Sequence, residues 1–214
     1  MKYEYVFWDW NGTLLDDVLV AFNAVNDMLT ARKLNNITLA QYRDYIDVPI
    51  IKFYERVLDM SNETMDGIAL EFHSLCEKRR LESSLAVGAE ALLRELNSQG
   101  VKQYIFSSSR EDRITPYLKE YRIDKYFSSV IAASDSFAGS KAERTRDYLA
   151  KNNIPPQKCL FIGDLVHDSE TALFIGADCA LLSCGHQSKN ALIATGRKVF
   201  ESFSALSEHI IKCL

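Results

Sequence analysis

Residues 5–17 read YVFWDWNGTLLDD, and the architecture of the chain follows from this run. Its apolar, aromatic and β-branched beginning is typical of a buried β-strand, which ends at Asp9 before a glycine, a threonine and two further acids. In open α/β sheets, ligands bind in the crevice outside the carboxyl ends of the strands. The carboxylate of Asp9 is therefore placed for chemistry, although an acid before Gly-Thr is also common in turns.

Size and composition are those of a globular protein. The chain has 214 residues, 47% hydrophobic and 25% charged, which is enough for one α/β core and a small second unit. No uncharged apolar run approaches the roughly 20 residues that span a bilayer, and Glu4 does not fit a signal peptide, so we expect a cytoplasmic protein without a membrane partner. The formal charge of −4 gives no basic surface for nucleic acid, so an anionic ligand needs a local site. Five cysteines without a CxxC pair are expected to be reduced packing residues.

The segment from Asp17 to Ser84 contains no predicted strand. Apolar residues at helical spacing predict helices over about 17–33, 38–46, 49–58 and 62–82, with a proline opening the third. Asp16 or Asp17 is available to cap the first helix. A block of helices is therefore expected directly after the first strand.

From Gly88 onward, helical and strand patterns alternate. Strands are predicted over about 101–106, 128–132, 159–162 and 178–182, and helices over about 88–99, 113–121 and 168–175. Another helix is expected after Ser140, which has capping-box spacing to Glu143. Repeated strand–helix–strand order predicts an α/β fold, a Rossmann-like parallel sheet with helices on both faces. The helical block then forms a small all-helical unit inserted into it.

Chemically active side chains fall at one edge of this sheet. Asp9 ends the first strand, Ser107 ends the next, and Lys141 begins a helix. Asp164 and Asp168 follow a late strand. Each residue has a simpler interpretation as a turn residue, a helix cap or a solvated charge. Their joint occurrence in this order is not explained by such turns and predicts a site.

With these residues, the chain resembles the haloacid dehalogenase superfamily of phosphohydrolases, and more closely its phosphoglycolate phosphatase-like branch. The resemblance rests on Asp9-Trp10-Asn11-Gly12-Thr13 as the first motif, Ser107 as the second, Lys141 as the third and Gly163-Asp164-x-x-x-Asp168 as the fourth. It covers essentially the whole chain. It implies a Rossmann-like core domain over 1–14 and 86–214, and a helical cap domain over 15–85, where that branch inserts its cap.

The resemblance also implies a role for each residue. Asp9 would attack a phosphoryl group and form an aspartyl phosphate. Asp9, the backbone carbonyl of Asn11 and Asp164 would bind Mg²⁺ through hard oxygen ligands, with Asp168 close by. Lys141 would supply a fixed positive charge to the phosphate and the nucleophile.

Further donors are expected around the phosphate. Ser107 would donate a hydrogen bond to a phosphate oxygen, with Ser108 as the alternative because strand ends are predicted only to within a residue or two. Backbone amides near Gly12 and Ser108 can cradle the other oxygens. The predicted sets are Asp9, Asn11, Ser107 and Lys141 for catalysis, Gly12, Ser107, Ser108 and Lys141 for substrate, and Asp9, Asn11, Asp164 and Asp168 for metal.

Asn11 departs from the family pattern. Phosphatases of this superfamily usually carry a second Asp at this position, which protonates the leaving alcohol and then activates water. An amide has no useful pKa, and loss of a general acid or base typically costs about 10²–10⁴-fold in rate. Three explanations remain open. The leaving group needs little protonation, as in an acyl phosphate; Asp16, Asp17 or a cap residue takes the role; or the protein binds a phosphorylated ligand with little turnover.

The expected function is a magnesium-dependent phosphohydrolase that acts on a small phosphorylated metabolite. The alternative is a catalytically weak phospholigand-binding or regulatory protein. A dehalogenase fits less well because that branch does without the magnesium-binding acids, for which Asp164 and Asp168 stand here. A receiver domain with a phosphorylated Asp fits less well because it has no helical insertion. His186 follows a strand end, and the resemblance suggests that its loop lies near the site. A monomer or a homodimer is expected.

Overall fold

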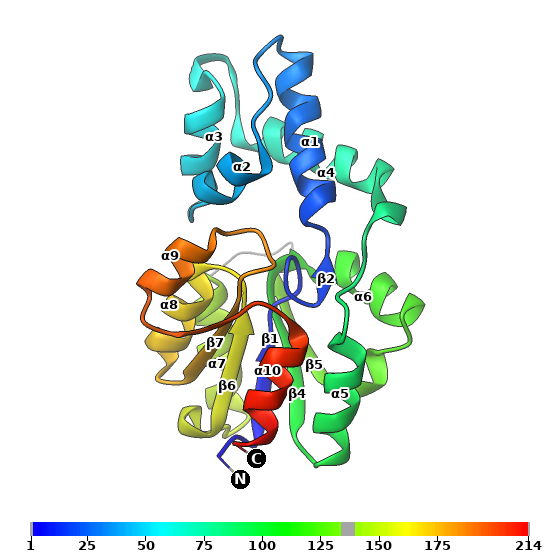
Figure 1. Ribbon diagram of the computed structural model, residues 1–214, viewed down its shortest axis with the longest axis vertical. Coiled ribbons are helices and arrows are strands. Elements are labelled where there is room, and N and C mark those ends of the chain that lie inside the picture. The colour runs from blue at the N-terminus through cyan, green and yellow to red at the C-terminus, as the bar shows by residue number, and fades with distance from the viewer. Residues whose placement is uncertain (1, 134–139, 214) are drawn as a thin grey trace.

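The computed structural model describes residues 2–133 and 140–213. Figure 1 shows a sheet flanked by helices, with a second group of helices standing over one end of it. Both termini lie at the opposite end of the sheet, where Lys2 N donates a 3.0 Å hydrogen bond to the Cys213 carbonyl (Figure 1). No helix in the described ranges is long and apolar enough to cross a membrane.

A six-stranded parallel sheet forms the centre of the molecule. Its order is β5 (Phe127–Ala133), β4 (Lys102–Arg110), β1 (Tyr5–Trp8), β6 (Cys159–Gly163), β7 (Asp178–Leu182) and β8 (Lys198–Phe200). Trp8 pairs with Ile105 on one side and with Ile162 on the other. The carboxyl ends of β1, β4 and β6 therefore meet at one edge, and β1 lies between the other two strands.

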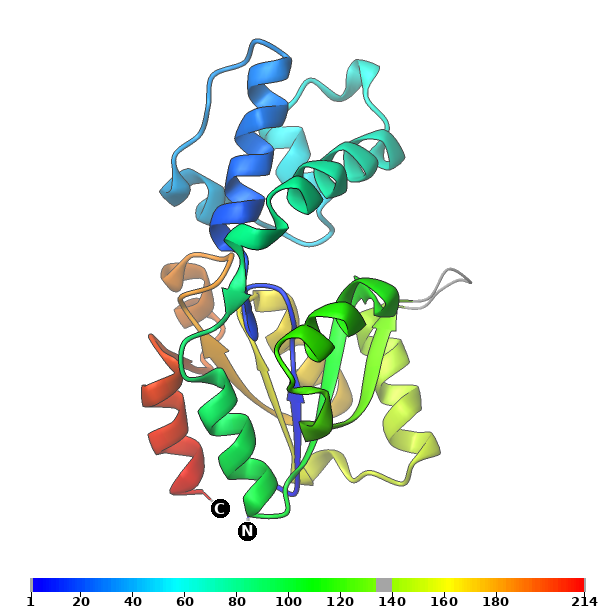
Figure 2. The ribbon, with the colours of Figure 1, turned by 90° about the vertical axis from the view of Figure 1, so that its right-hand side faces the viewer.

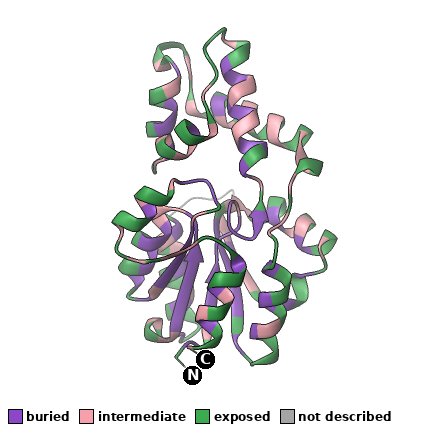
Figure 3. Cartoon of the chain, in the orientation of Figure 1, coloured by how far each residue is buried: buried purple, intermediate pink, exposed green. Residues whose placement is uncertain are grey.

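Helices cover both faces of the sheet, which confirms the predicted fold class. One face packs against α5 (Ala89–Ser98), α6 (Glu111–Glu120) and α10 (Phe203–Ile211), and the other against α7 (Lys141–Lys151), α8 (Val166–Ile175) and α9 (Lys189–Ala194). Along β1, Val6 and Trp8 pack into the first layer and Phe7 into the second, as strand alternation requires. The strands β1, β6 and β7 are almost entirely buried (Figure 3).

The remaining helices form a separate packed group, which we call the helical insertion (18–82). It contains α1 (Val18–Ala31), α2 (Leu39–Tyr45), α3 (Ile51–Val57), α4 (Met65–Lys78) and two short 3₁₀ helices, Met60–Asn62 and Arg80–Glu82. It has its own apolar core, with Phe53 and Ile68 fully buried. Figures 1 and 2 show it standing over the end of the sheet at which β1 ends.

Two short strands connect the insertion to the sheet. β2 (Leu15–Asp16) enters it and β3 (Ser84–Leu85) leaves it, and the two pair antiparallel, with Leu15 opposite Leu85. The sequence did not predict them because two residues carry no detectable alternation. The pairing brings both connections together at one place, which we call the hinge pair.

The strand after Gly100 is longer than predicted. We expected it to end at Ser107, whereas β4 continues to Arg110. Its pairing with β5 is interrupted between Phe106 and Arg110 by a register shift. Such irregularities re-aim side chains at a sheet edge, and here Ser109 Oγ reaches Asn11 in the loop after β1.

Candidate active site

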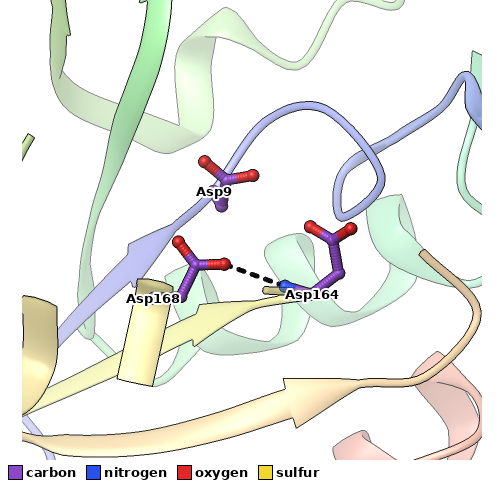
Figure 4. Close-up of side chains that lie close together, drawn as sticks. All are labelled: Asp9, Asp164 and Asp168. Carbon is purple, nitrogen blue, oxygen red and sulfur yellow. Dashed lines mark hydrogen bonds between the residues drawn. The ribbon is translucent and has the colours of Figure 1, made fainter. Parts of the chain in front are cut away.

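Three buried acids meet at the carboxyl edge of the sheet. Asp9 follows β1, Asp164 follows β6, and Asp168 lies in the first turn of α8 (Figure 4). Carboxylate oxygens of the three lie within 4.8 Å of one another, and each residue is at most 6% exposed. Asp9 N donates a 2.8 Å hydrogen bond to the Ile162 carbonyl, which fixes the end of β1 against β6. The parallel topology thus brings together acids that are more than 150 positions apart.

Asp168 is held by the backbone that follows β6. Its Oδ2 accepts hydrogen bonds from Asp164 N at 3.0 Å and from Leu165 N at 2.9 Å. A carboxylate at the positive end of a helix is stabilised by these amides. Gly163 permits this approach because a Cβ atom there would overlap the Asp168 carboxylate.

Lys141 lies directly beside these acids. It is the first residue of α7, and Ser140 and Glu143 form the predicted capping box that starts this helix. Its Nζ donates to Asp9 Oδ1 and, at 2.7 Å, to Asp168 Oδ1, and it lies 4.0 Å from the centre of the Phe106 ring. The ammonium thus bridges two of the three carboxylates.

One lysine does not balance three carboxylates. Burial raises the pKa of Asp9 to about 8, with Lys141 opposing and the neighbouring carboxylates adding to the rise. Burial likewise raises the pKa of Asp164 to about 6. Burial would lower the pKa of Lys141, but Asp168 and Asp9 raise it instead. Three clustered carboxylates exceed what one lysine can neutralise, and their atoms are hard oxygens, so these acids can hold a divalent metal ion.

The loop after β1 packs tightly on this group of acids. Thr13 Oγ1 donates a 2.9 Å hydrogen bond to Asp164 Oδ1. Gly12 has a φ of +70°, and a Cβ atom at this position would overlap the Asp164 carboxylate and the ring of His186. The motif therefore needs glycine here both for its backbone conformation and for space.

The backbone amide of Gly12 has a hydrogen-bond partner within the protein. We expected it to cradle a phosphate oxygen, but it donates a 2.8 Å hydrogen bond to Asp17 Oδ1. Gly12 as a substrate-binding residue therefore stays a prediction, and it requires this amide to exchange Asp17 for a phosphate oxygen.

The side chain of Asn11 is held at both ends. Its Nδ2 donates a 2.6 Å hydrogen bond to Asp17 Oδ2, and its Oδ1 accepts one of 2.6 Å from Ser109 Oγ. Ser109 was not among the predicted residues. Its link to Asn11 depends on the extension of β4, which the sequence pattern does not indicate.

Ser107 and Ser108 differ in exposure. Ser107 is 2% exposed, its Oγ accepts a 3.1 Å hydrogen bond from Ser109 N, and its carbonyl accepts one of 3.2 Å from Arg144 Nη2. Ser108 is exposed. The Ser107 hydroxyl, which accepts the bond from Ser109 N, can also donate one of its own.

Asp17 does not cap α1 with its side chain, contrary to one of the two predicted caps. It occupies the N-cap position, but its carboxylate faces Asn11, Gly12 and His186. Burial would raise its pKa, whereas the charge of His186 and the hydrogen bonds lower it. Burial would lower the pKa of His186, and Asp17 raises it to about 9. The two residues therefore form a buried ion pair next to the acids.

His186 lies against the acids, as the resemblance suggested for its loop, although its individual contacts were not predicted. It is 9% exposed, and its backbone N–H donates a 2.6 Å hydrogen bond to Asp164 Oδ2. Its Nε2 lies 3.1 Å from Asp17 Oδ1, and its Nδ1 lies 2.9 Å from Tyr42 Oη. The partners are separated from it by up to 169 positions, and no local pattern links them.

Comparison with known proteins gives consistent results. A family model described as haloacid dehalogenase-like hydrolase matches residues 6–182. A phosphoglycolate phosphatase from Pseudomonas fluorescens is 25% identical over 210 residues, which cover 94% of this chain and 74% of that protein. A haloacid dehalogenase-like hydrolase from Streptococcus pneumoniae has a similar structure, with a TM-score of 0.83, 18% identity, and coverage of 98% of this chain and 99% of that chain. CbbY from Rhodobacter sphaeroides, solved in complex with phosphate, has a TM-score of 0.70, 17% identity, and coverage of 95% and 96%.

Proposed function

Because the chain belongs to the haloacid dehalogenase-like hydrolase family, we propose that it is a magnesium-dependent phosphatase that works through an aspartyl phosphate. The observation that carries this proposal is the meeting of Asp9, Asp164, Asp168 and Lys141 at one sheet edge. The substrate would be a small phosphorylated metabolite. Since one relative is named phosphoglycolate phosphatase, 2-phosphoglycolate is the first compound to test.

Asp9 is the proposed nucleophile. One of its oxygens would form a bond to phosphorus while the bond from phosphorus to the leaving oxygen breaks, and the electron pair departs with that oxygen. Water would then attack the same phosphorus and release phosphate, returning the carboxylate. Asp9 suits this role because it lies at the strand end, held by its backbone on β6 and by Lys141 on one oxygen.

Lys141 and the serines would stabilise charge on the phosphoryl group. Phosphoryl transfer is catalysed mainly by positioning and electrostatics. The Lys141 ammonium is shared between Asp168 and the proposed nucleophile Asp9, which supports a role beside the transferred group. Ser107, with Ser108 as the alternative, would donate a hydroxyl hydrogen bond to a phosphate oxygen.

Asp9, the backbone carbonyl of Asn11 and Asp164 would hold Mg²⁺, with Asp168 behind them. When bound, the ion would offset the repulsion between the Asp9 carboxylate and the phosphate dianion. The backbone carbonyl is the group that Asn11 can offer, because its amide is engaged by Asp17 and Ser109. Thr13 and the His186 amide would orient Asp164 through its two oxygens.

Asn11 limits the kinds of leaving group that the proposed enzyme could release. Its amide cannot protonate an alcohol, so an acyl phosphate or another good leaving group would react best. Asp17 is a carboxylate next to Asn11 and an alternative proton donor, although three hydrogen-bonding partners already hold it. The competing function is binding of a phosphorylated ligand with little turnover. Asn11 is the one residue that favours this alternative.

The helical insertion is the proposed cap, with domain limits near residues 15 and 85. Its position over the carboxyl edge of the sheet supports this role, because a lid there would exclude bulk water and contact the leaving group (Figure 2). The hinge pair would be where such a lid pivots.

The test is phosphate release from p-nitrophenyl phosphate and from acetyl phosphate, measured with Mg²⁺ and with excess chelator. Wild-type protein should be active only with the metal, and Asp9→Asn should be inactive. Asp124→Asn removes an exposed acid ahead of β5 and should behave as wild type. Activity without metal or in Asp9→Asn contradicts the mechanism. Tight binding of 2-phosphoglycolate without any turnover favours the competing function.

A further inference from the structure

Five residues after β7 connect the helical insertion with the group of acids. We call residues 184–188, with sequence CGHQS, the 184–188 loop. It lies between α2 of the insertion and the carboxyl edge of the sheet. Its contacts fall into two sets, one to each side.

Toward the insertion, the loop binds α2 and the residue after it. Arg43 Nε donates a 3.0 Å hydrogen bond to the Gly185 carbonyl, and Arg43 Nη2 donates one of 2.9 Å to the Cys184 carbonyl. Ser188 N donates to the Arg43 carbonyl at 3.1 Å, and Gln187 Nε2 donates to the Ile46 carbonyl at 2.9 Å. These bonds hold the insertion at a second place, far in sequence from the hinge pair.

Toward the acids, the same loop packs against Asp164. The backbone N–H of His186 donates to Asp164 Oδ2, and a Cβ atom at Gly185 would overlap the Asp164 side chain. Gln187 Oε1 accepts a 2.6 Å hydrogen bond from Val166 N, at the start of α8. Movement of the loop therefore changes the surroundings of Asp164 directly.

The ring of His186 joins both sets. It lies between Tyr42 Oη on α2 and the Asp17 carboxylate next to the hinge pair. Tyr42 is 3% exposed and His186 is 9% exposed, so neither finds a water partner without rearrangement. The same residue donates its backbone N–H to Asp164 Oδ2, so a shift of the ring would be felt at this hydrogen bond.

We propose that His186 is a positioning residue, and that its contact with Tyr42 couples docking of the helical insertion to the orientation of Asp164. The inference relies on the proposed function only in taking Asp164 as a metal ligand. Coupling between two sites is reciprocal. Docking of the insertion strengthens metal binding, and metal binding strengthens docking to the same extent.

The direct test is the affinity for Mn²⁺, measured without substrate by electron paramagnetic resonance. Tyr42→Phe removes the hydroxyl but keeps the ring that packs on Phe22 and Phe53. We expect it to weaken Mn²⁺ binding about five-fold, the effect of one lost hydrogen bond that supports a ligand. His186→Gln should weaken binding at least as much.

Tyr54→Phe is the matched control. Tyr54 is also buried in the core of the insertion and packs on Phe53, but in the described part of the chain it has no hydrogen bond to the 184–188 loop. Its Mn²⁺ affinity should equal that of the wild type. If Tyr42→Phe and Tyr54→Phe bind Mn²⁺ equally well, the coupling does not exist.

A second measurement uses the unmodified protein and does not depend on folding of the variants. Amide hydrogen exchange of residues 39–46 and 184–188 should slow when Mg²⁺ is added, while exchange in α10 stays unchanged. Equal exchange with and without the metal overturns the proposal. A protein that binds neither ion contradicts the proposed function together with this inference, whereas a protein that binds both ions without these differences contradicts this inference alone.

Discussion

Asn11 Nδ2 donates a 2.6 Å hydrogen bond to Asp17 Oδ2, so the residue in the usual general-acid position is bound by a carboxylate from the start of the helical insertion. An aspartate at position 11 would face that carboxylate, and two anions at this distance cannot both stay ionised. The asparagine and Asp17 therefore form a compatible pair.

The pair predicts how a general acid can be restored. Asn11→Asp alone should lower the melting temperature and raise turnover only weakly, because one carboxyl group must hold a proton. Asn11→Asp combined with Asp17→Asn should raise kcat for alkyl phosphates by about 10²-fold or more, with a smaller gain for acetyl phosphate. Equal gains for both substrate classes, or none in the double variant, would remove the leaving-group explanation.

Lys141 should be essential to the stability of the metal-free protein. Its removal leaves Asp9 and Asp168 buried without a cation, which typically costs about 3–5 kcal/mol. We expect Lys141→Met to lose stability of this order in chelator and to regain part of it in Mg²⁺, as measured by urea unfolding. Lys158→Met breaks an exposed ion pair with Glu4 and should cost less than about 1 kcal/mol. Similar losses of stability in the two variants would show that the Lys141 bridge contributes no more than an exposed ion pair.

Much of the fold could be predicted because its signals are local. The apolar run before Asp9, the Gly100 stop and the Ser140 capping box each depend on neighbouring residues, and the corresponding elements form as expected. The two-residue strands of the hinge pair and the extension of β4 arise from tertiary pairing. Such pairing leaves no periodic pattern in the sequence.

The site was predictable where the motif residues sit at strand ends. Parallel pairing of β1 with β4 and β6 necessarily brings Asp9 near Ser107 and Asp164. The contacts of Asp17 and His186 were not predictable, because they join the helical insertion, the loop after β1 and the loop after β7. Only the three-dimensional arrangement shows that Asp17 binds the Gly12 amide.

Gly12→Ala should weaken metal binding through a steric effect. The new Cβ atom would overlap the Asp164 carboxylate, in addition to the cost of a positive φ, typically about 1–2 kcal/mol for a residue other than glycine. We expect Mn²⁺ affinity to fall more than about ten-fold. Gly100→Ala is the control, since its φ is +77° but a Cβ atom there meets nothing within 4 Å. If both variants retain normal Mn²⁺ affinity, Gly12 is not required for space beside Asp164.

Metal affinity should depend on pH in a defined direction. The pKa of Asp9 is raised to about 8 and that of Asp164 to about 6, so below these values a metal ion must displace protons. The dissociation constant for Mg²⁺ should therefore fall as the pH rises from 6 to 8 and change little above pH 8. Isothermal titration calorimetry at several pH values provides the measurement. A constant affinity across this range would show that the acids are ionised without the metal.

The most direct test of the central claim is a crystal structure with Mg²⁺ and beryllium fluoride, which imitates a phosphoryl group bound to a carboxylate. We predict trifluoroberyllate on a carboxylate oxygen of Asp9, next to Lys141, with Mg²⁺ bound by Asp9, the carbonyl of Asn11 and Asp164. Beryllium fluoride bound elsewhere, or a magnesium ion that does not contact both Asp9 and Asp164, would contradict the account.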